Sequence, residues 1–156
     1  MQAVGASSLN QAIKAVAVAR TYLEGDDIDL EVEVSRVPDD TIRNLIQLKL
    51  NKKKRSSQMA LKDEPVDLRA AATTETVSLA GAISNNIREG ARVRVTAIGP
   101  IPVFRAVDAV IKARLFLQKD SLDIVFVPQF TTIDPSGDKN SVVNALQLVI
   151  SSVPIN

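Results

Sequence analysis

The 156-residue chain contains no cysteine, no histidine and no tryptophan, and only five of its residues are aromatic. Without cysteine it has neither a disulfide framework nor a thiol nucleophile. Without histidine it lacks the side chain that most often serves as a general base and as a metal ligand. We therefore expect a protein that is not an enzyme and that binds no metal and no other cofactor.

Long apolar runs and a charge of one sign are also missing. No uninterrupted apolar stretch reaches the roughly 18 residues of a membrane-spanning helix, and the first residues do not form a signal-peptide pattern. We expect an intracellular protein with no membrane partner. The formal net charge is +1, so a nucleic-acid-binding surface would have to be a local patch. With 46% hydrophobic residues and few aromatics, the core should consist of Ala, Val, Ile and Leu.

The chain does contain an internal repeat. Residues 3–37 align with residues 97–131 without a gap, at an offset of 94 positions. The identical pairs include Gly5 and Gly99, Arg20 and Arg114, and Asp29 and Asp123. Such self-similarity indicates two copies of one structural unit, whose differences separate scaffold from function.

The second copy reads as a complete unit. Alternating or apolar segments predict strands over residues 66–72, 91–97, 122–128 and 143–151. Between them, helices are predicted up to residue 89, after a cap among residues 73–75, and over residues 103–118. The order β-α-β-α-β-β indicates an α+β fold, a two-layer α/β sandwich.

The first copy begins late in the unit. Residues 1–4 correspond to the end of the second strand, and Ser7 or Ser8 is expected to cap a helix over residues 9–24. Strands are predicted over residues 28–34 and 42–50. The opening strand and helix have no counterpart, so either the sequence is a fragment or another chain completes the unit.

These elements divide the chain into a partial unit over residues 1–50, a polar linker over residues 51–65 and a complete unit over residues 66–156. The linker holds a dense cluster of basic residues: Lys52, Lys53, Lys54 and Arg55. It reads either as a solvated segment or as a phosphate-binding or nuclear-import segment.

Several positions shared by the copies have structural explanations. Alanines recur at helical spacing and would let each helix pack closely: Ala12, Ala15 and Ala19 in the first copy, and Ala106, Ala109 and Ala113 in the second. Arg20 should form a salt bridge with Asp29, and Arg114 with Asp123. Gly5 and Gly99 lie at strand-to-helix turns that need either a positive φ or a close approach of the backbone.

The helix start after Gly5 is the best candidate for a binding site, because exposed N–H groups and the helix dipole attract anions. There the first copy carries Ser7, Ser8, Asn10, Gln11 and Lys14. Asn10, Lys14 and Thr21 share one helical face, a polar set suited to phosphate or sugar contacts. The second copy differs, with Ile101, Phe104, Arg105 and Asp108, and its Asp108 should pair with Lys112. The alternative is that both helices have solvated faces without a ligand.

One stretch resembles the stage V sporulation protein S family of small Alba-like proteins. The matching residues are Gly5, Ala6, Leu9, Asn10, Gln11, Ala12, Lys14 and Ala15, then Ile28, Asp29 and Leu30. The second copy resembles the first half of the family through Val77, Ala80, Gly81 and Ala82, but departs from the helix-start motif at Phe104, Arg105 and Asp108. Together the matches cover about three quarters of the chain.

The resemblance implies Alba-like β-α-β-α-β-β units, frequent dimerisation and nucleic-acid binding. A tandem pair could mimic a dimer within one chain, and would suggest a eukaryotic version in the cytoplasm, nucleus or plastid. We expect a non-catalytic protein that contacts DNA or RNA phosphates through Gly5, Ser7, Asn10, Gln11, Lys14, Lys52, Lys53, Lys54, Arg55 and Arg105. The alternative is a regulatory scaffold that self-associates without nucleic acid, using the apolar strand face of Val125, Val127 and Val149.

Overall fold

The computed structural model describes residues 1–55, 64–133 and 143–155. Its elements are β1 (Gln2–Val4), α1 (Gly5–Tyr22), η1 (Glu24–Asp26), β2 (Ile28–Arg36), β3 (Leu45–Lys54), β4 (Val66–Ala70), α2 (Thr76–Arg88), β5 (Val93–Ala97), α3 (Pro100–Leu117), η3 (Gln118–Asp120), β6 (Leu122–Ile133) and β7 (Val143–Pro154). The strands form one seven-stranded sheet in the order β1-β3-β2-β6-β7-β5-β4. The predicted α+β class is confirmed.

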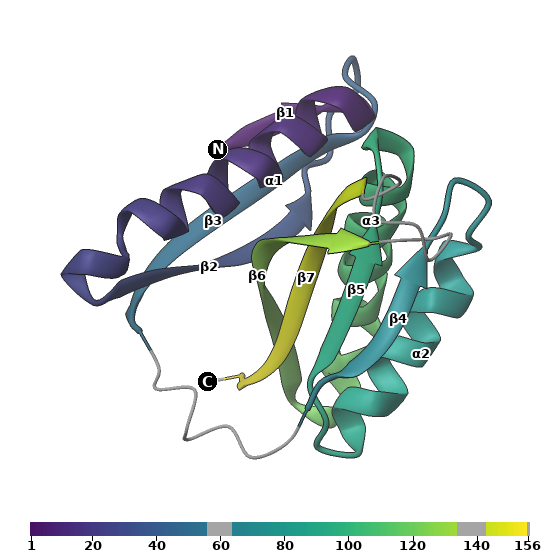
Figure 1. The fold of residues 1–156 in the computed structure, drawn as a ribbon. Coiled ribbons are helices and arrows are strands. Elements are labelled where there is room, and N and C mark those ends of the chain that lie inside the picture. The colour runs from purple at the N-terminus through teal and green to yellow at the C-terminus, as the bar shows by residue number, and fades with distance from the viewer. Residues whose placement is uncertain (56–63, 134–142, 156) are drawn as a thin grey trace.

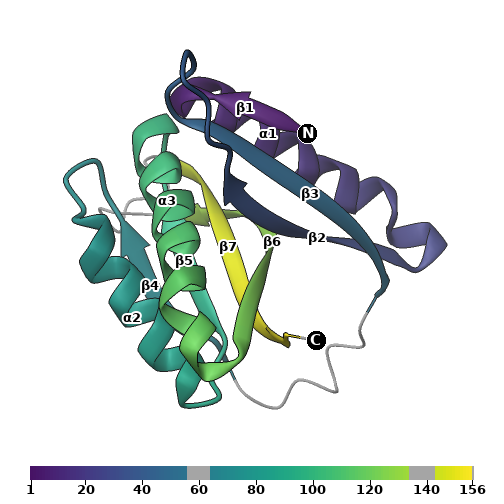
Figure 2. The ribbon, with the colours of Figure 1, turned by 180° about the vertical axis from the view of Figure 1, so that it is seen from behind.

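The sheet has two halves with the same sequence of elements. The half made of β1, α1, β2 and β3 corresponds to β5, α3, β6 and β7, while β4 and α2 occur in the second half alone among the described residues. In Figure 1, α1 lies in front of β2 and β3, whereas α2 and α3 lie behind β4 and β5. Figure 2 shows the reverse from behind. Each half therefore consists of two layers, a sheet and the helices on one of its faces.

The two halves meet where β2 pairs with β6. The register of this antiparallel contact is Val32 opposite Phe126, and these two residues are themselves 94 positions apart. The contacts across the junction are reciprocal. Arg20 Nη1 donates to Pro128 O at 2.8 Å, and Arg114 Nη1 donates to Val34 O at 2.7 Å. The halves are thus related by an approximate two-fold axis through the Val32–Phe126 pair.

One hydrophobic core runs through both halves. It consists almost entirely of Ala, Val, Ile and Leu, as the composition predicted, with Phe126 as its largest fully buried side chain. Phe126 lies at the junction, where a ring fills the space between the crossing halves. None of the helices in the described parts of the chain is long and apolar enough to cross a membrane.

Both predicted salt bridges are present. Arg20 Nε donates to Asp29 Oδ1 at 2.6 Å, and Arg114 Nε donates to Asp123 Oδ1 at 2.7 Å. Each aspartate also accepts the N–H of the next residue in its strand. Because each arginine also reaches a carbonyl of the other half, the aspartates orient the side chains that join the halves.

The prediction of where α1 begins was wrong. The helix starts at Gly5, four residues before the predicted start, and its N-cap position is Val4, whose side chain makes no capping hydrogen bond. Ser7 and Ser8 are exposed and lie inside the first turns. Gly5 has φ = +79°, the first of the two predicted reasons for a glycine at this turn, so the chain passes directly from β1 into the helix.

The predicted linker also begins too early. β3 continues through Lys54, because Lys52, Lys53 and Lys54 pair with Leu30, Asp29 and Ile28 at the beginning of β2. The backbone ladder decides the structure here, since charged side chains at a sheet edge can still extend into solvent. Residues 51–54 therefore belong to the first half, and residues 56–63 of the predicted linker lie outside the described residues.

Candidate functional site

The first turns of α1 and α3 lie side by side close to the two-fold junction (Figure 1). Ala6 of α1 lines one pocket together with Ile101, Phe104 and Arg105 of α3. Asn10 of α1 lines a second pocket together with residues of the other half. The starts of α1 and α3, which correspond to each other in the repeat, therefore form one surface with a pocket on each side.

The start of α1 is open to an anion. No side chain of the described residues caps it, and its first turn holds no acidic residue. The start of α2 is different, because the Glu75 carboxylate accepts the N–H groups of Val77 and Ser78. In the described parts of the chain no carboxylate accepts the N–H groups at the start of α1, and the nearest pocket carboxylate, Asp108, is paired with two cations.

Two arginines flank this start. Arg105 projects from α3 into the pocket that Ala6 also lines. Arg43 precedes Asn44, whose carbonyl accepts the Gly5 N–H at 3.5 Å. Neither guanidinium has a hydrogen-bond or ion-pair partner among the described residues. Arg105 can therefore donate to a ligand in the pocket beside Ala6, and Arg43 to one in the adjoining pocket, which shares Asn44 with the first.

The pocket on the Arg105 side is lined by Asp108, which belongs to an internal ion pair. Arg36 Nη2 donates to Asp108 Oδ1 at 2.6 Å, and Lys112 Nζ donates to Asp108 Oδ2 at 2.9 Å, as predicted for Lys112. Burial by itself would raise the pKa of Asp108. The hydrogen bonds and positive charges of Lys112 and Arg36 outweigh it, so the pKa lies below its ordinary value. Asp108 is thus an anion held by two cations.

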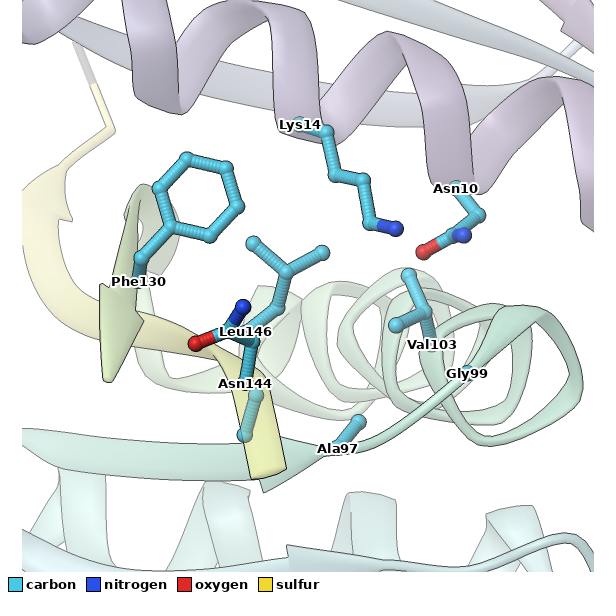
Figure 3. Close-up of a pocket in the computed structure, with 9 residues that line it drawn as sticks. Asn10, Lys14, Ala97, Gly99, Val103, Phe130, Asn144 and Leu146 are labelled. Carbon is cyan, nitrogen blue, oxygen red and sulfur yellow. The ribbon is translucent and has the colours of Figure 1, made fainter. Parts of the chain in front are cut away.

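The pocket on the other side has no such pair. It has a volume of about 360 Å³ and is lined by Asn10, Lys14, Ala97, Gly99, Val103, Phe130, Asn144, Ala145 and Leu146. Figure 3 shows Asn10 and Lys14 directed from α1 toward the strands and helix of the second half. The alternative of a merely solvated helix face is wrong for Asn10. Its exposed fraction is 3%, because α3 and the second half of the sheet cover it.

The structure brings only part of the predicted site together. Gly5, Ser7, Asn10, Gln11, Lys14 and Arg105 lie around the helix starts, with Ser7 and Gln11 exposed. The basic cluster lies at the opposite end of α1, because β1 pairs with β3 at residues 45–47 and the cluster follows at residues 52–55. The start of the 18-residue helix is about 27 Å from its far end, where the basic cluster lies.

Within the basic cluster the side chains have different roles. Arg55 Nη2 donates to the carbonyls of Arg20 and Ile28, and so ties the end of α1 to β2. Lys53 pairs with Glu31 at 3.5 Å. Lys52 and Lys54 are exposed. Arg55 is therefore a structural residue, and the two exposed lysines also discourage pairing of further strands at this edge.

Sequence reasoning missed four residues of the two pockets and their rim. Arg36, Arg43, Phe130 and Asn144 lie at or just beyond the ends of strands, outside the helix motif. Phe130 is the repeat partner of Arg36, and Asn144 corresponds to Asn44 at the offset of 100 that applies after the longer second loop. A comparison of the two copies beyond their helices would have shown that an arginine in one copy is replaced by a phenylalanine in the other.

A family comparison matches the same regions. The sequence model of stage V sporulation protein S (SpoVS) matches residues 1–43 and 66–150, which together form most of the chain. The chain belongs to the stage V sporulation protein S family. The resemblance carried by Gly5, Asn10 and Lys14 is thereby confirmed, and the matched residues contain both helix starts that form the candidate site.

Proposed function

We propose that this SpoVS-family protein is a non-catalytic nucleic-acid-binding protein that contacts phosphates at the start of α1. The observation that carries the proposal is the helix start beside Arg105 and the adjoining Arg43 pocket: among the described residues no side chain caps the helix and neither guanidinium has a partner. Backbone N–H groups and arginines at a helix N-terminus are a recurring arrangement for phosphate contacts. Ser7, exposed in the first turn, adds a hydroxyl.

The chemistry of this surface favours backbone contacts over base reading. Tyr22, the most exposed aromatic side chain of the described residues at 80%, lies at the far end of α1 and not beside the helix start. Phe104 is the one aromatic residue that lines the Arg105 pocket in the described parts of the chain, and a single ring does not form a platform for stacking successive bases. Asp39 shares the loop of Arg43 and lowers the local positive charge. We therefore expect modest affinity, little sequence preference and a strong dependence on salt.

Fluorescence-anisotropy titrations of labelled single- and double-stranded RNA and DNA at about 50 and 200 mM salt test this proposal. Arg43→Ala and Arg105→Ala should each weaken binding across all sequences. Each should reduce the slope of log K against log salt by about 1. The loss follows from the phosphate contact that each guanidinium makes.

The double variant Lys52→Ala/Lys54→Ala is the matched control, since it removes two exposed cations at the other end of α1. It should bind as the unaltered protein does. Loss of binding in this variant alone would place the nucleic acid on the edge of β3. If none of the labelled RNA and DNA probes binds at about 50 mM salt, the proposed nucleic-acid-binding function is overturned.

A second function, a self-associating scaffold, has its own observation. Ala106, Ala109 and Ala113 of α3 are fully buried where α2 packs, whereas their partners on α1 are more accessible, and Ala15 is exposed. β1 pairs with β3 alone among the described residues, while its counterpart β5 is also covered by β4. The strand face first expected to assemble is less accessible, because Val125 is buried and Val127 and Val149 are half-buried.

Light scattering over a range of concentrations tests the scaffold, with a second copy of this chain as the partner on α1. Ala15→Arg should abolish association, because the charge would enter the surface where the partner packs. Thr21→Arg adds the same charge to an outward position, whose repeat partner Leu115 stays 60% exposed beside α2, and should leave association intact. A protein that remains a monomer at every concentration contradicts the scaffold.

A further inference from the structure

The pocket lined by Asn10 and Lys14 has a polar atom without a partner. Asn10 is 97% buried, and its Oδ1 accepts no hydrogen bond from the described residues. A buried carbonyl oxygen without a donor costs free energy, and such atoms are rare in folded proteins. In Figure 3 the Asn10 amide points into the pocket, where a bound molecule could supply the missing donor.

Lys14 adds an unneutralised charge to the same pocket. Its side chain is half-buried, and no carboxylate of the described residues pairs with it. Figure 3 shows the ammonium group entering the pocket from α1, on the same side as Asn10. A cation in such a concave site favours an anionic group on the ligand.

The remaining lining residues fit an apolar ring. Phe130, 45% exposed, stands at one side, and Leu146 and Val103 form the apolar floor. Asn144 offers an amide at the rim. The volume of about 360 Å³ falls within the range of small-molecule sites, roughly 300–1,000 Å³.

The symmetry-related pocket shows what this geometry brings together. There Asp108 stands in the place of Lys14, and Arg36 in the place of Phe130, and the two form an ion pair at 2.6 Å. Arg36 also donates to Asn44, the counterpart of Asn144, at 3.0 Å. In this pocket the charge of Asp108 is therefore already neutralised by Arg36 and Lys112. In the Asn10–Lys14 pocket, Lys14 replaces the aspartate and Phe130 replaces the arginine. The corresponding ion pair therefore cannot form there.

We propose that the Asn10–Lys14 pocket binds a small organic anion that carries a flat ring and a hydroxyl or N–H donor, as a nucleoside monophosphate does. The anionic group pairs with Lys14, the donor bonds to Asn10 Oδ1, and the ring lies against Phe130. The site is independent of phosphate binding by Arg43 and Arg105. Its ligand is either a free nucleotide or the terminal nucleotide of a strand.

Isothermal titration calorimetry with the four ribonucleoside monophosphates tests the pocket. At least one should bind with a sub-millimolar dissociation constant, and its unphosphorylated nucleoside and inorganic phosphate should each bind at least ten-fold more weakly. A 5′-phosphorylated single-stranded dinucleotide separates the two sources. Binding by the dinucleotide alone assigns the pocket to a strand terminus, and binding by the monophosphate assigns it to the free nucleotide.

Three variants locate the ligand. Lys14→Met and Phe130→Ser should each weaken binding at least ten-fold. Asn10→Leu should do the same while leaving the thermal midpoint unchanged or higher, because leucine of similar size removes the unpaired oxygen. A merely structural asparagine would lower the midpoint on replacement. Lys54→Met and Tyr22→Leu, at the far end of α1, are the matched controls and should bind normally.

The proposal is overturned if neither the monophosphates nor the dinucleotide bind at millimolar concentration. It is equally overturned if Lys14→Met and Asn10→Leu bind as the unaltered protein does. These results are separable from the nucleic-acid test, because Arg43→Ala and Arg105→Ala should leave nucleotide affinity unchanged. The Asn10 and Lys14 variants should in turn bind a long strand that lacks a 5′-phosphate with unchanged affinity, because Arg43 and Arg105 are intact in them.

Discussion

Replacing Phe126 with alanine should lower the free energy of unfolding by about 3–5 kcal/mol. Phe126 is fully buried and is the largest side chain of the core. It lies opposite Val32 at the pairing that joins β2 to β6. Truncation would remove contacts in both halves and leave a cavity that the surrounding strands cannot fill. Urea unfolding followed by circular dichroism measures the loss.

Phe130→Ala is the matched control for this prediction. Phe130 lies on the same strand and the same face of β6, but it is 45% exposed. Its truncation should cost no more than about 1 kcal/mol, since the side chain already contacts solvent. Equal losses for the two variants would show that the junction is not the centre of the core. Because one core spans both halves, each variant should unfold in a single transition.

Asp29→Asn should lower the free energy of unfolding at pH 7 by about 1.5–3 kcal/mol, the range for a hydrogen bond to a charged group. Asp29 is 7% exposed and accepts hydrogen bonds from both Arg20 Nε and Leu30 N–H. Arg20 also holds Pro128 O of the other half. The loss is therefore expected to reach across the junction and to exceed that of an exposed carboxylate.

The pH dependence of this loss has a definite direction. Burial by itself would raise the pKa of Asp29. The hydrogen bonds from Arg20 and Leu30 and the charges of Arg20 and Arg55 outweigh burial, so the pKa lies below its ordinary value. A carboxylate with a lowered pKa stabilises the folded state above its unfolded pKa of about 3.9. That contribution disappears as the pH falls through the folded pKa. The difference between Asp29→Asn and the unaltered protein should therefore shrink in acid.

Urea unfolding at pH 7 and at pH 3 checks both parts of this prediction. Asp26→Asn, an exposed carboxylate three residues earlier, is the control and should change stability by no more than about 0.5 kcal/mol at either pH. If Asp29→Asn behaved like Asp26→Asn at pH 7, the salt bridge would not stabilise the fold.

Local patterns explain why most elements were predictable. The strands β2, β5 and β7 show alternation or β-branched runs, and α2 ends before Gly90, whose φ is +87°. The Arg20–Asp29 and Arg114–Asp123 bridges followed from their spacing across a helix end and the next strand. Predicted element boundaries were wrong where long-range strand pairing determines the structure. Lys52–Lys54 are an example, because their polar sequence alone predicts a linker although they pair with β2.

The candidate site was only half predictable, because its two sides come from different halves of the chain. The motif from Gly5 to Lys14 was visible in the sequence. Its opposite wall was not, since Phe130 and Asn144 reach Lys14 only through the β2–β6 junction. The same holds for the Arg36–Asp108 pair, which joins residues 72 positions apart.

The sequence by itself determined the two copies, the family, the aliphatic core and the turns at Gly5 and Gly99, since these depend on local spacing and residue type. The tertiary structure alone decided that Asn10 is buried, that Arg55 caps the end of α1, and that one pocket contains a paired carboxylate while the other contains an unpaired lysine among the described residues. These properties depend on which side chains the two halves bring face to face. A local pattern carries no information about a partner that lies far away in the chain.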